Sequence, residues 1–318
     1  MMKTIFEAQD FIMNTGVEQK ICGPAPRSIY EASVEKLHML EDRMSFYRDE
    51  SETSLLNRHA GKEAVKLSKD MMFILEQAQE FAYLSKNTFH ILLAPLVQLW
   101  RNAGAKNKLP SHDQISDALA LCDSENLVLD KTAGTAYLKA GSMIDLGAIG
   151  KGFAADVCCD FYRELGASSA FINLGGNVKT LGKRPDGKPW AIGLQHPDKP
   201  RGNSYGAILC ADQSVVTSGA YERYQVIDGT KYHHIMDGQT GYPSASDLKS
   251  VTVISESSIQ ADALSTAAFV MGLKKGVDLI YNAKCTGAVF FTAANEVYLT
   301  KGMKPHFRLM ERLKCYEI

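Results

Sequence analysis

The segment from Ile144 to Asp156 carries the richest set of chemically useful residues in the sequence. It reads Ile-Asp-Leu-Gly-Ala-Ile-Gly-Lys-Gly-Phe-Ala-Ala-Asp, so three glycines join a predicted strand to a predicted helix. Such a turn exposes backbone N–H groups at a helix N-terminus, where a phosphate is electrostatically favoured. The spacing matches neither of the common nucleotide-binding glycine patterns. A phosphate site and a plain glycine turn therefore both stay open, and Asp145 and Asp156 could meet hydroxyls, meet a cation or cap a helix.

A second candidate lies in the apolar segment Ala261-Asp-Ala-Leu-Ser-Thr266. Asp262 and Thr266 are four residues apart, which places them on one helix face with about 5 to 6 Å between their Cβ atoms. A carboxylate and a hydroxyl are hard oxygen ligands that suit Mg²⁺, an ion that completes its shell with waters and substrate phosphates. Taken alone, the pattern favours a structural interpretation, in which Asp262 interacts with the first helical turn and Thr266 bonds back to a carbonyl.

Three further segments combine polar side chains with strand or turn residues. His233 and His234 are adjacent on a predicted strand, so they point to opposite faces and cannot both bind one metal; we expect one to face a site and the other solvent. An imidazole near neutral pH is a natural general base or phosphate partner. Thr217-Ser-Gly219 could hold phosphate or begin a turn, and Asn173-Leu-Gly-Gly-Asn177 favours a tight turn. A hydrolase serine is a poor explanation, because the sequence has no Gly-x-Ser-x-Gly elbow.

Composition and charge limit the class of partner. The chain has 318 residues, of which 45% are hydrophobic and 22% charged, as in a globular protein with one large domain or two packed halves. Thirty-five basic and 36 acidic residues give a formal charge of -1. This balance argues against nonspecific binding of nucleic acid, which relies on many uncompensated cations. We therefore expect a small-molecule or protein substrate.

The cysteines and the N-terminus bear on location. The seven cysteines are scattered without a Cys-x-x-Cys spacing, which indicates reduced thiols rather than a metal or redox motif. Glu7 and Asp10 interrupt the first apolar stretch, unlike the core of a signal peptide. No run approaches the ~18 consecutive apolar residues of a membrane helix. These features predict a cytoplasmic protein that does not span a membrane.

The elements that must position these residues change in character along the chain. Helical periodicity predicts helices over about 28–46, with a Ser28–Glu31 capping box, then from Ser68, from Ser111 and from 149 to Gly166. Short strands are predicted over 124–145 and again from 168 onward, and helices return at about 258–272 and 274–282. Asp228-Gly229 is a strong hairpin signal. Because helices and strands are grouped rather than alternating, we expect an α+β fold, more helical over about 1–123 and β-rich over about 124–318.

Seven segments follow one another in a recognisable order over residues 12–300. They are Met44–Asn57, Pro95–Trp100, Asp145–Asp156, Asn173–Asn177, Thr217–Gly219, His234–Asp237 with Thr240–Pro243, and Ala261–Thr266. In this order they resemble the ApbE family of FAD:protein FMN transferases, also named flavin transferases. The resemblance implies layered helices and mainly antiparallel sheets in one compact, T-fold-like unit over residues 1–318. It also gives each segment a matching role, which outweighs the structural interpretations above.

The resemblance implies a specific reaction. FAD would bind with its pyrophosphate on Mg²⁺, and a Ser or Thr hydroxyl of a target flavoprotein would attack the FMN phosphorus and release AMP. Positioning and charge neutralisation supply most of the catalysis in such transfers. By motif match, the metal ligands would be Asp262, the Thr266 hydroxyl and the backbone carbonyl of Ala148. His234 would activate the acceptor hydroxyl or bind phosphate, so His234 and Asp262 are the expected catalytic residues.

The expected FAD contacts also follow from the resemblance. Asp145 matches the family's FAD-contacting aspartate, while Glu52 and Asn57 would shape the adenosine or isoalloxazine end. The other expected cofactor-binding residues are the flavin-contacting segment Thr88, Phe89 and His90, together with Lys151, Ser218, Gly219 and His234.

Three positions depart from the family pattern. Phe89-His90-Ile91-Leu92 replaces the usual Phe-Asp-x-Thr, Met13-Asn14-Thr15 replaces Met-Gly-Thr, and Gly238 stands where the family has proline. The family's common lipoprotein signal is not found in this sequence, so we expect a cytosolic member with a cytosolic acceptor. Two alternatives remain: Mg²⁺-dependent hydrolysis of FAD to FMN and AMP, and non-catalytic FAD binding, which His90 and Leu92 motivate.

Overall fold

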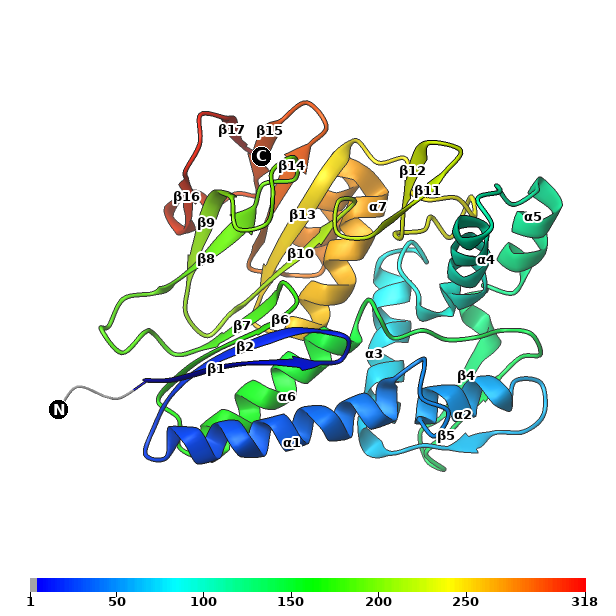
Figure 1. Ribbon diagram of the computed structural model, residues 1–318, viewed down its shortest axis with the longest axis horizontal. Helices are drawn as coiled ribbons and strands as arrows, with labels where there is room; N and C mark the ends of the chain where they lie inside the picture. Colours follow the sequence, from blue (N-terminus) through cyan, green and yellow to red (C-terminus); the bar gives the residue numbers. More distant parts are fainter. Residues whose placement is uncertain (1–4) are drawn as a thin grey trace.

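The computed structural model describes residues 5–318, and a nine-stranded sheet dominates them. The strand order is β1-β2-β6-β7-β10-β13-β14-β15-β17, and every pair is antiparallel except β15 with β17. The hairpin of the first two strands therefore joins the sheet through β2, which pairs with β6 from the middle of the chain (Figure 1). The nine strands are β1 (Ile5–Ile12), β2 (Thr15–Cys22), β6 (Ser169–Leu174), β7 (Asn177–Leu181), β10 (Ser214–Gly219), β13 (Leu248–Ser255), β14 (Gly287–Thr292), β15 (Glu296–Leu299) and β17 (Lys314–Glu317).

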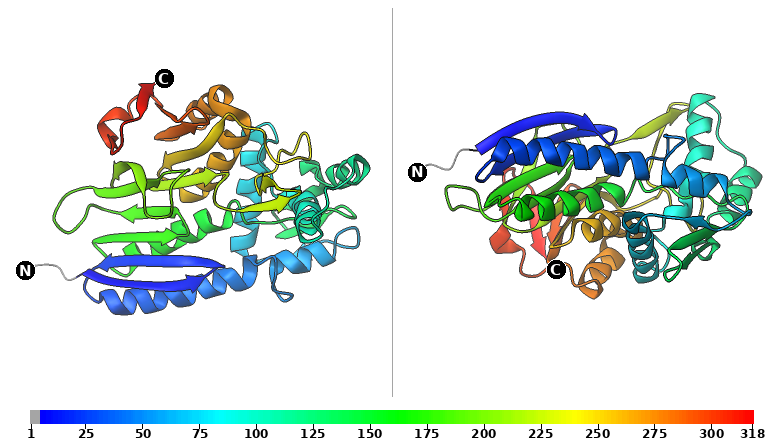
Figure 2. Two further views of the ribbon diagram at one scale, coloured as in Figure 1. Left: turned by 45° about the horizontal axis from the view of Figure 1, so that its top comes forward. Right: turned by 90° about the horizontal axis from the view of Figure 1, so that it is seen from below.

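Three long helices cover one face of this sheet. They are α1 (Pro26–Met44), α6 (Gly150–Glu164) and α7 (Ser258–Asn282), and the view from below in Figure 2 separates α1 and α6 from the strands. α1 packs on β1 and β2, α6 on β6 and β7, and α7 on β10 and β13. The main hydrophobic core lies between the two layers, and burial of its apolar surface is the dominant favourable term in folding.

A smaller sheet covers part of the opposite face. It consists of β8 (Trp190–Gln195), β9 (Ser204–Cys210) and β16 (Phe307–Leu309). Successive strand residues point to opposite faces, and accordingly Val253 of β13 joins the helix-side core whereas Ile254 joins the cluster under the small sheet.

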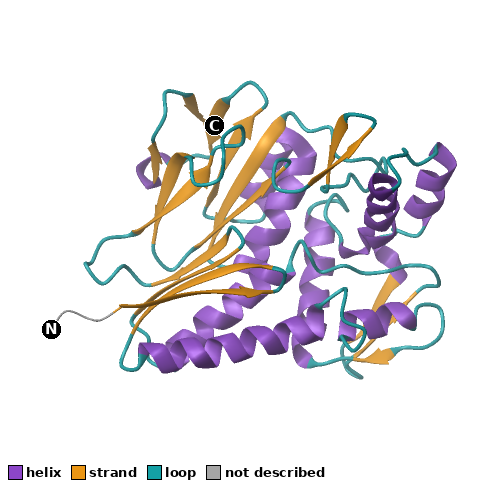
Figure 3. Ribbon diagram, in the orientation of Figure 1, coloured by secondary structure: helices purple, strands orange, loops and turns teal. Residues whose placement is uncertain are grey.

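The remaining helices gather beside this layered part, on the right in Figure 3. There α3 packs against α7 as part of the main core, whereas α4 packs against β11 around a third apolar cluster that contains Trp100, Ile115 and Met236. Over residues 5–318, no helix combines the length and the hydropathy needed to cross a bilayer. The elements of this region are α2 (Glu52–Arg58), β3 (Val65–Lys66), α3 (Lys69–Leu84), the 3₁₀ turn Ile91–Leu93, α4 (Ala94–Ala105), α5 (His112–Ala120), the 3₁₀ turn Ser124–Asn126, β4 (Leu127–Asp130), β5 (Thr135–Leu138), β11 (Tyr224–Ile227) and β12 (Thr230–His233); a third 3₁₀ turn, Lys304–His306, precedes β16.

The α+β class is confirmed, and so are most of the local helix signals. Ser68 caps α3 by accepting a hydrogen bond from Met71 N–H, and Ser111, where a helix start was predicted, forms a capping box with Gln114. The capping box at Ser28 is wrong, because α1 begins two residues earlier. There a proline with preset φ takes the first turn and Ala25, which has no side-chain cap, takes the N-cap position.

Two predicted breaks in regular structure are confirmed by the backbone. Asp228 and Gly229 both have positive φ, 48° and 76°, as the tight β11–β12 hairpin requires. Gly272 has φ 76° and ψ 177° inside α7, which kinks where two helices were expected to meet. Asp247 Oδ1 accepts a hydrogen bond from Leu273 N–H at 3.1 Å and so caps the second half of the helix.

Candidate functional site

The loop from Ile144 to Ile149 is held in place by contacts from two distant segments. Asn57 on α2 makes a paired contact with Ile144, since its Nδ2 donates to the carbonyl at 3.0 Å and its Oδ1 accepts from the N–H at 2.8 Å. Asp145 N–H donates to Ile91 O at 2.8 Å, and Asp145 Oδ1 accepts from Gly147 N–H at 2.8 Å. Asn57, expected to shape one end of the FAD site, fixes the backbone beside Asp145.

The first turn of α6 crosses α7 at Gly152. Gly152 N–H donates to Asp262 Oδ2 at 2.9 Å, and Asp262 is only 5% exposed. A Cβ at position 152 would lie 2.4 Å from Ser258 O, so only glycine permits this approach. Lys151 Nζ lies 3.8 Å from Asp262 Oδ2 and donates to Gly147 O at 2.8 Å, which ties the loop to the same carboxylate.

Asp156 joins the two helices one turn further along α6. Its carboxylate accepts from the N–H groups of Ser258 and Ile259 at 2.8 and 2.9 Å, and it is paired with the largely buried Lys179. Asn177 accepts a hydrogen bond from the Ser258 hydroxyl at 2.7 Å. Of the roles left open for Asp156, helix capping is the one that the structure shows, and it caps α7 rather than its own helix.

The end of β10 brings a hydroxyl to the same face of α7. Ser218 Oγ lies 2.8 Å from Ser265 Oγ and 3.0 Å from Thr266 Oγ1. Thr266 is half-buried, one helical turn beyond Asp262, as the four-residue spacing predicts. Residues from β10 and α7 that are 47 or 48 positions apart in the sequence therefore form one hydrogen-bonded group.

The oxygen atoms here fit a hard divalent cation. Gly152 N–H, which in a regular helix would bond to Ala148 O, bonds to Asp262 instead, and within residues 5–318 no hydrogen bond reaches Ala148 O. Asp262 Oδ1 likewise accepts none from the described residues. With the Thr266 hydroxyl, these are oxygen donors of the kind Mg²⁺ takes, completed by water and phosphate. No group of three or more His, Cys, Asp or Glu side chains that could hold a metal occurs in the described part of the chain.

Three cationic side chains act on Asp145 through their charge. Burial raises the pKa of Asp145, while Lys151, Arg101 and Arg223 act in the opposite direction through their charge. Arg101 comes from α4 and Arg223 from the segment before β11, so sequence spacing gave no reason to group them. Together with Lys151 they provide positive charge suited to an anionic ligand.

The two adjacent histidines have different surroundings. His234 is exposed, yet neighbouring protein atoms desolvate the ring and lower its pKa to about 4, helped by the charge of Arg223. Its Nδ1 lies 3.0 Å from Arg223 O. Because a carbonyl only accepts, Nδ1 carries the proton and Nε2 keeps a free lone pair.

His233 was a candidate to face solvent, but it is half-buried. Its Nε2 lies 2.9 Å from Ser244 O and its Nδ1 accepts from Ile235 N–H at 3.3 Å. Burial lowers the pKa of its imidazole, and the ring packs edge-on against Phe269. Both nitrogens are used, so His233 is structural and only His234 is available for chemistry.

The segment expected to contact flavin is mostly buried. Phe89 is part of the main core and 3% exposed, whereas Thr88 lines a cavity of about 370 Å³ together with Asp237. His90 is 7% exposed, burial lowers its pKa to about 4, and its Nδ1 has no hydrogen-bond partner among the described residues. A Cβ at Gly238 would lie 2.9 Å from His90 Nε2. Gly238 and His90, two of the positions that depart from the family pattern, are therefore neighbours in the fold.

Two expected cofactor residues have structural contacts. Glu52 accepts from Ser68 N–H at 2.7 Å and lies 3.9 Å from Arg43 Nε, and it thereby links α2 to the start of α3. Gly219 ends β10 next to Ser218, and a Cβ there would lie 2.6 Å from the Tyr221 ring. The structure gives these two residues packing roles and no contact with the Asp262 group.

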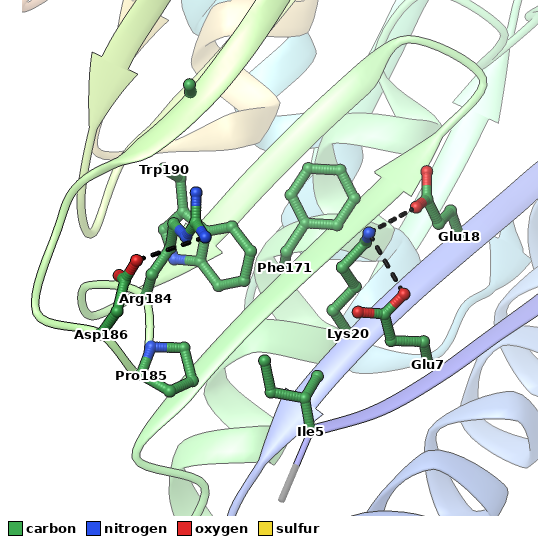
Figure 4. A pocket seen from close by; sticks show the side chains of 10 residues that line it. Ile5, Glu7, Glu18, Lys20, Phe171, Arg184, Pro185, Asp186 and Trp190 are labelled. Carbon is green, nitrogen blue, oxygen red and sulfur yellow. Dashed lines mark ion pairs between the residues drawn. The ribbon is translucent and has the colours of Figure 1, made fainter. Parts of the chain in front are cut away.

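A separate cavity of about 830 Å³ is lined by residues of β1, β2, β6 and β8 and of the loop before β8 (Figure 4). There Lys20 pairs with Glu7 and Glu18 at 3.3 and 3.2 Å, opposite the tilted rings of Phe171 and Trp190. None of the residues expected from sequence to act on FAD lines this cavity.

Sequence relatives match most of the chain. The model of the ApbE family matches residues 13–290. A Klebsiella pneumoniae protein named FAD:protein FMN transferase is 35% identical over 268 residues, which cover 84% of this chain and 83% of the relative. A Treponema pallidum protein of the same name is 31% identical over 324 aligned residues, and the alignment covers 96% of this chain and 90% of the relative.

Solved structures agree with the sequence relatives. The ApbE protein of Thermotoga maritima superposes with a TM-score of 0.87 at 31% identity, over 95% of this chain and 99% of that one. The apo flavinyl transferase ApbE of Pseudomonas stutzeri superposes with a TM-score of 0.84 at 27% identity, over 96% of this chain and 98% of that one. By family match, sequence relatives and shared fold, this chain belongs to the ApbE family.

Proposed function

We propose that this chain is an FAD:protein FMN transferase that attaches FMN to a Ser or Thr hydroxyl of a target flavoprotein and releases AMP. The observation that carries the proposal is the meeting of three segments around Asp262. The loop with Ala148 and the face of α7 with Asp262 and Thr266 supply oxygen ligands. The start of α6 orients Asp262 through Gly152 N–H, and cationic side chains act on the same loop. The shared name of the two relatives, FAD:protein FMN transferase, supports the reaction class.

Asp262, Thr266 and the Ala148 carbonyl would hold a Mg²⁺ ion. When bound, such an ion neutralises charge on a pyrophosphate during phosphoryl-type transfer. Lys151, Arg101 and Arg223 would add positive charge around the phosphates, and Gly152 N–H would keep one oxygen of Asp262 oriented.

The transfer step needs a base for the acceptor hydroxyl. The acceptor oxygen forms a bond to the FMN phosphorus, the bond from that phosphorus to the bridging oxygen breaks, and AMP leaves with that oxygen. We assign the released proton to His234 Nε2. The ring is neutral at physiological pH, and the Nδ1–H bond to Arg223 O leaves Nε2 free to accept a proton.

We also propose that residues 1–318 act as one catalytic unit in the cytoplasm. Support for one unit comes from the contacts of Asn57 with Ile144 and of Gly152 with Asp262, which tie the first half of the chain to the middle and the middle to the end. Support for the cytoplasm comes from the seven cysteines, all of them free thiols.

The proposal is tested by incubating the protein with FAD, MgCl₂ and a candidate acceptor flavoprotein. We expect a fluorescent acceptor band on a denaturing gel, an acceptor mass increase equal to one FMN phosphoester, and one AMP for each FMN transferred. Asp262→Ala should lose the reaction, whereas the control Asp160→Ala, an exposed carboxylate on α6, should keep it. AMP and free FMN without labelled acceptor would replace the proposal with FAD hydrolysis, and FAD binding without AMP would replace it with a non-catalytic binder.

A further inference from the structure

The hydroxyl groups beside the predicted cation site form a connected chain. Ser218 Oγ contacts both Ser265 Oγ and Thr266 Oγ1, at 2.8 and 3.0 Å, and Ser265 Oγ lies 3.0 Å from the backbone carbonyl of Asp262. Ser265 is fully buried, and it belongs to none of the groups assigned to chemistry above. We refer to Thr266, Ser218, Ser265 and the Asp262 carbonyl as the hydroxyl chain.

The direction of every hydrogen bond in this chain follows from counting protons. A hydroxyl has one proton to donate, and a carbonyl oxygen has none. Ser265 must therefore donate to Asp262 O, which leaves Ser218 to donate to Ser265. Ser218 then has no proton left, so its 3.0 Å contact with Thr266 is a hydrogen bond only if Thr266 donates. The alternative acceptor for Thr266, Asp262 O at 3.5 Å, lies beyond the ordinary range of O–H···O bonds.

This direction has a consequence for ligand binding. A hydroxyl that binds a cation offers a lone pair to the ion and must send its proton elsewhere. With its proton committed to Ser218, Thr266 Oγ1 keeps both lone pairs for other partners. The Asp262 carbonyl can only accept a hydrogen bond, so it determines which hydroxyl donates at each step of the chain. The Thr266 hydroxyl is therefore already oriented before an ion binds.

We propose that Ser265 and Ser218 are positioning residues that set the proton direction of the Thr266 hydroxyl and thereby raise the affinity of the site for a divalent cation. The proposal rests on the function proposed above, because it takes Thr266 as a metal ligand. In Ser265→Ala, the Ser218 proton would lose its acceptor, so the hydrogen bond between Ser218 and Thr266 could run in either direction. The Thr266 proton would then no longer be directed away from the ion, although neither Asp262 nor Thr266 is changed. Loss of an orienting partner of a metal ligand typically weakens binding about 10- to 100-fold.

The test measures Mn²⁺ binding to the metal-free protein by the electron paramagnetic resonance signal of free Mn²⁺, without FAD and without turnover. We expect Ser265→Ala and Ser218→Ala to raise the dissociation constant at least about 10-fold. Ser265→Thr, which keeps the hydroxyl, should restore affinity. The matched control is Thr252→Val, which removes a buried hydroxyl on β13 that lies 2.8 Å from the Thr217 hydroxyl on β10, and it should leave Mn²⁺ binding unchanged. Thermal unfolding of each variant separates loss of folding from loss of affinity, and Ser218→Ala remains informative if Ser265→Ala does not fold.

The outcomes distinguish the two proposals. If wild type binds Mn²⁺, Asp262→Ala loses it and both serine variants keep wild-type affinity, the hydroxyl chain has no positioning role while the proposed function stands. If the serine variants change the melting temperature but not the affinity, their role is structural and the inference is wrong. If wild type binds no Mn²⁺, the assignment of the metal ligands and the hydroxyl chain fail together.

Discussion

Gly152→Ala is the substitution that tests the geometry of the site most directly. The added Cβ would lie 2.4 Å from Ser258 O, 2.7 Å from Ile259 Cα and 2.8 Å from Asp262 Cβ. Ordinary contacts begin at 3.4 Å, so the first turn of α6 must move away from α7 by about 1 Å. Two of the three obstructing atoms are backbone atoms of a helix, which cannot turn aside as a flexible side chain would.

The cost of this movement has two parts. Overpacking of a close contact typically costs ~1–3 kcal/mol. Replacing glycine by alanine inside a helix returns about 0.5–1 kcal/mol, because it restricts the unfolded chain. Together the two parts give a net loss of up to ~2.5 kcal/mol. With about 2.1 cal/mol/K of unfolding entropy per residue over 318 residues, this lowers the melting temperature by up to roughly 4 °C.

The effect on activity should be larger than the effect on stability. The same shift would lengthen the 2.9 Å bond from Gly152 N–H to Asp262 Oδ2 and displace the carboxylate from the loop. A misplacement of about 1 Å can cost about 100-fold in rate. FMN transfer should therefore fall by one to two orders of magnitude at a temperature where the variant is still folded.

Gly150→Ala is the matched control, two residues away in the same glycine-rich segment. Its Cβ would meet Leu146 Cβ and Met44 Sδ at 3.8 Å, which is ordinary contact. This variant should keep its activity and unfold at or above the wild-type temperature. Melting curves and initial transfer rates for both variants check the reasoning. It fails if Gly152→Ala transfers FMN at the wild-type rate, or if both glycine variants are equally damaged.

Two further predictions concern histidines. His234→Gln should lower the transfer rate about 100-fold or more, because a general base typically contributes 10²–10⁴. Since desolvation lowers its pKa to about 4, the acid limb of kcat/KM in the wild type should lie near pH 4. A limb near pH 6.5 would contradict this lowering of the pKa, and an unchanged transfer rate in His234→Gln would exclude His234 as the base. His90 is buried and neutral in the folded state, so the unfolded chain takes up an extra proton as the pH falls from about 6.5 to 4, and stability decreases over this window. Between pH 6.5 and 4, the free energy of unfolding measured in urea should fall by up to about 3 kcal/mol less in His90→Gln than in the wild type. An equal pH dependence in both proteins would contradict the lowered pKa of His90.

The sequence predicted best what depends on neighbouring residues. The caps at Ser68 and Ser111, the hairpin at Asp228-Gly229 and the break at Gly272 are each set within about four residues, and all four are present. The spacing of Asp262 and Thr266 on α7 belongs to the same class. Short-range steric and hydrogen-bonding rules are sufficient for such features.

Features that depend on distant pairing were not accessible in the same way. The β1–β2 hairpin was not predicted as a pair of strands, although Met13 and Asn14 both turn with φ 56°. Its place in the sheet follows from pairing with β6, about 150 residues later. α2 and α4 were also missed, the first because it is only seven residues long and the second because its Pro95 reads as a breaker, yet sits in the first turn.

The glycine-rich segment illustrates why spacing alone left its role open. Phosphate binding and a plain turn both require glycine for backbone freedom at the loop, but Gly152 is required for a third reason. It lies inside α6 without a left-handed φ, and its missing side chain lets another helix reach within hydrogen-bonding distance. That reason exists only once α7, about 110 residues later, is in place. The positive charge of the site arises in the same way, because Arg101 and Arg223 join Lys151 only in the folded chain. A protein with a formal charge of -1 can therefore offer a locally cationic site for a pyrophosphate without a basic surface.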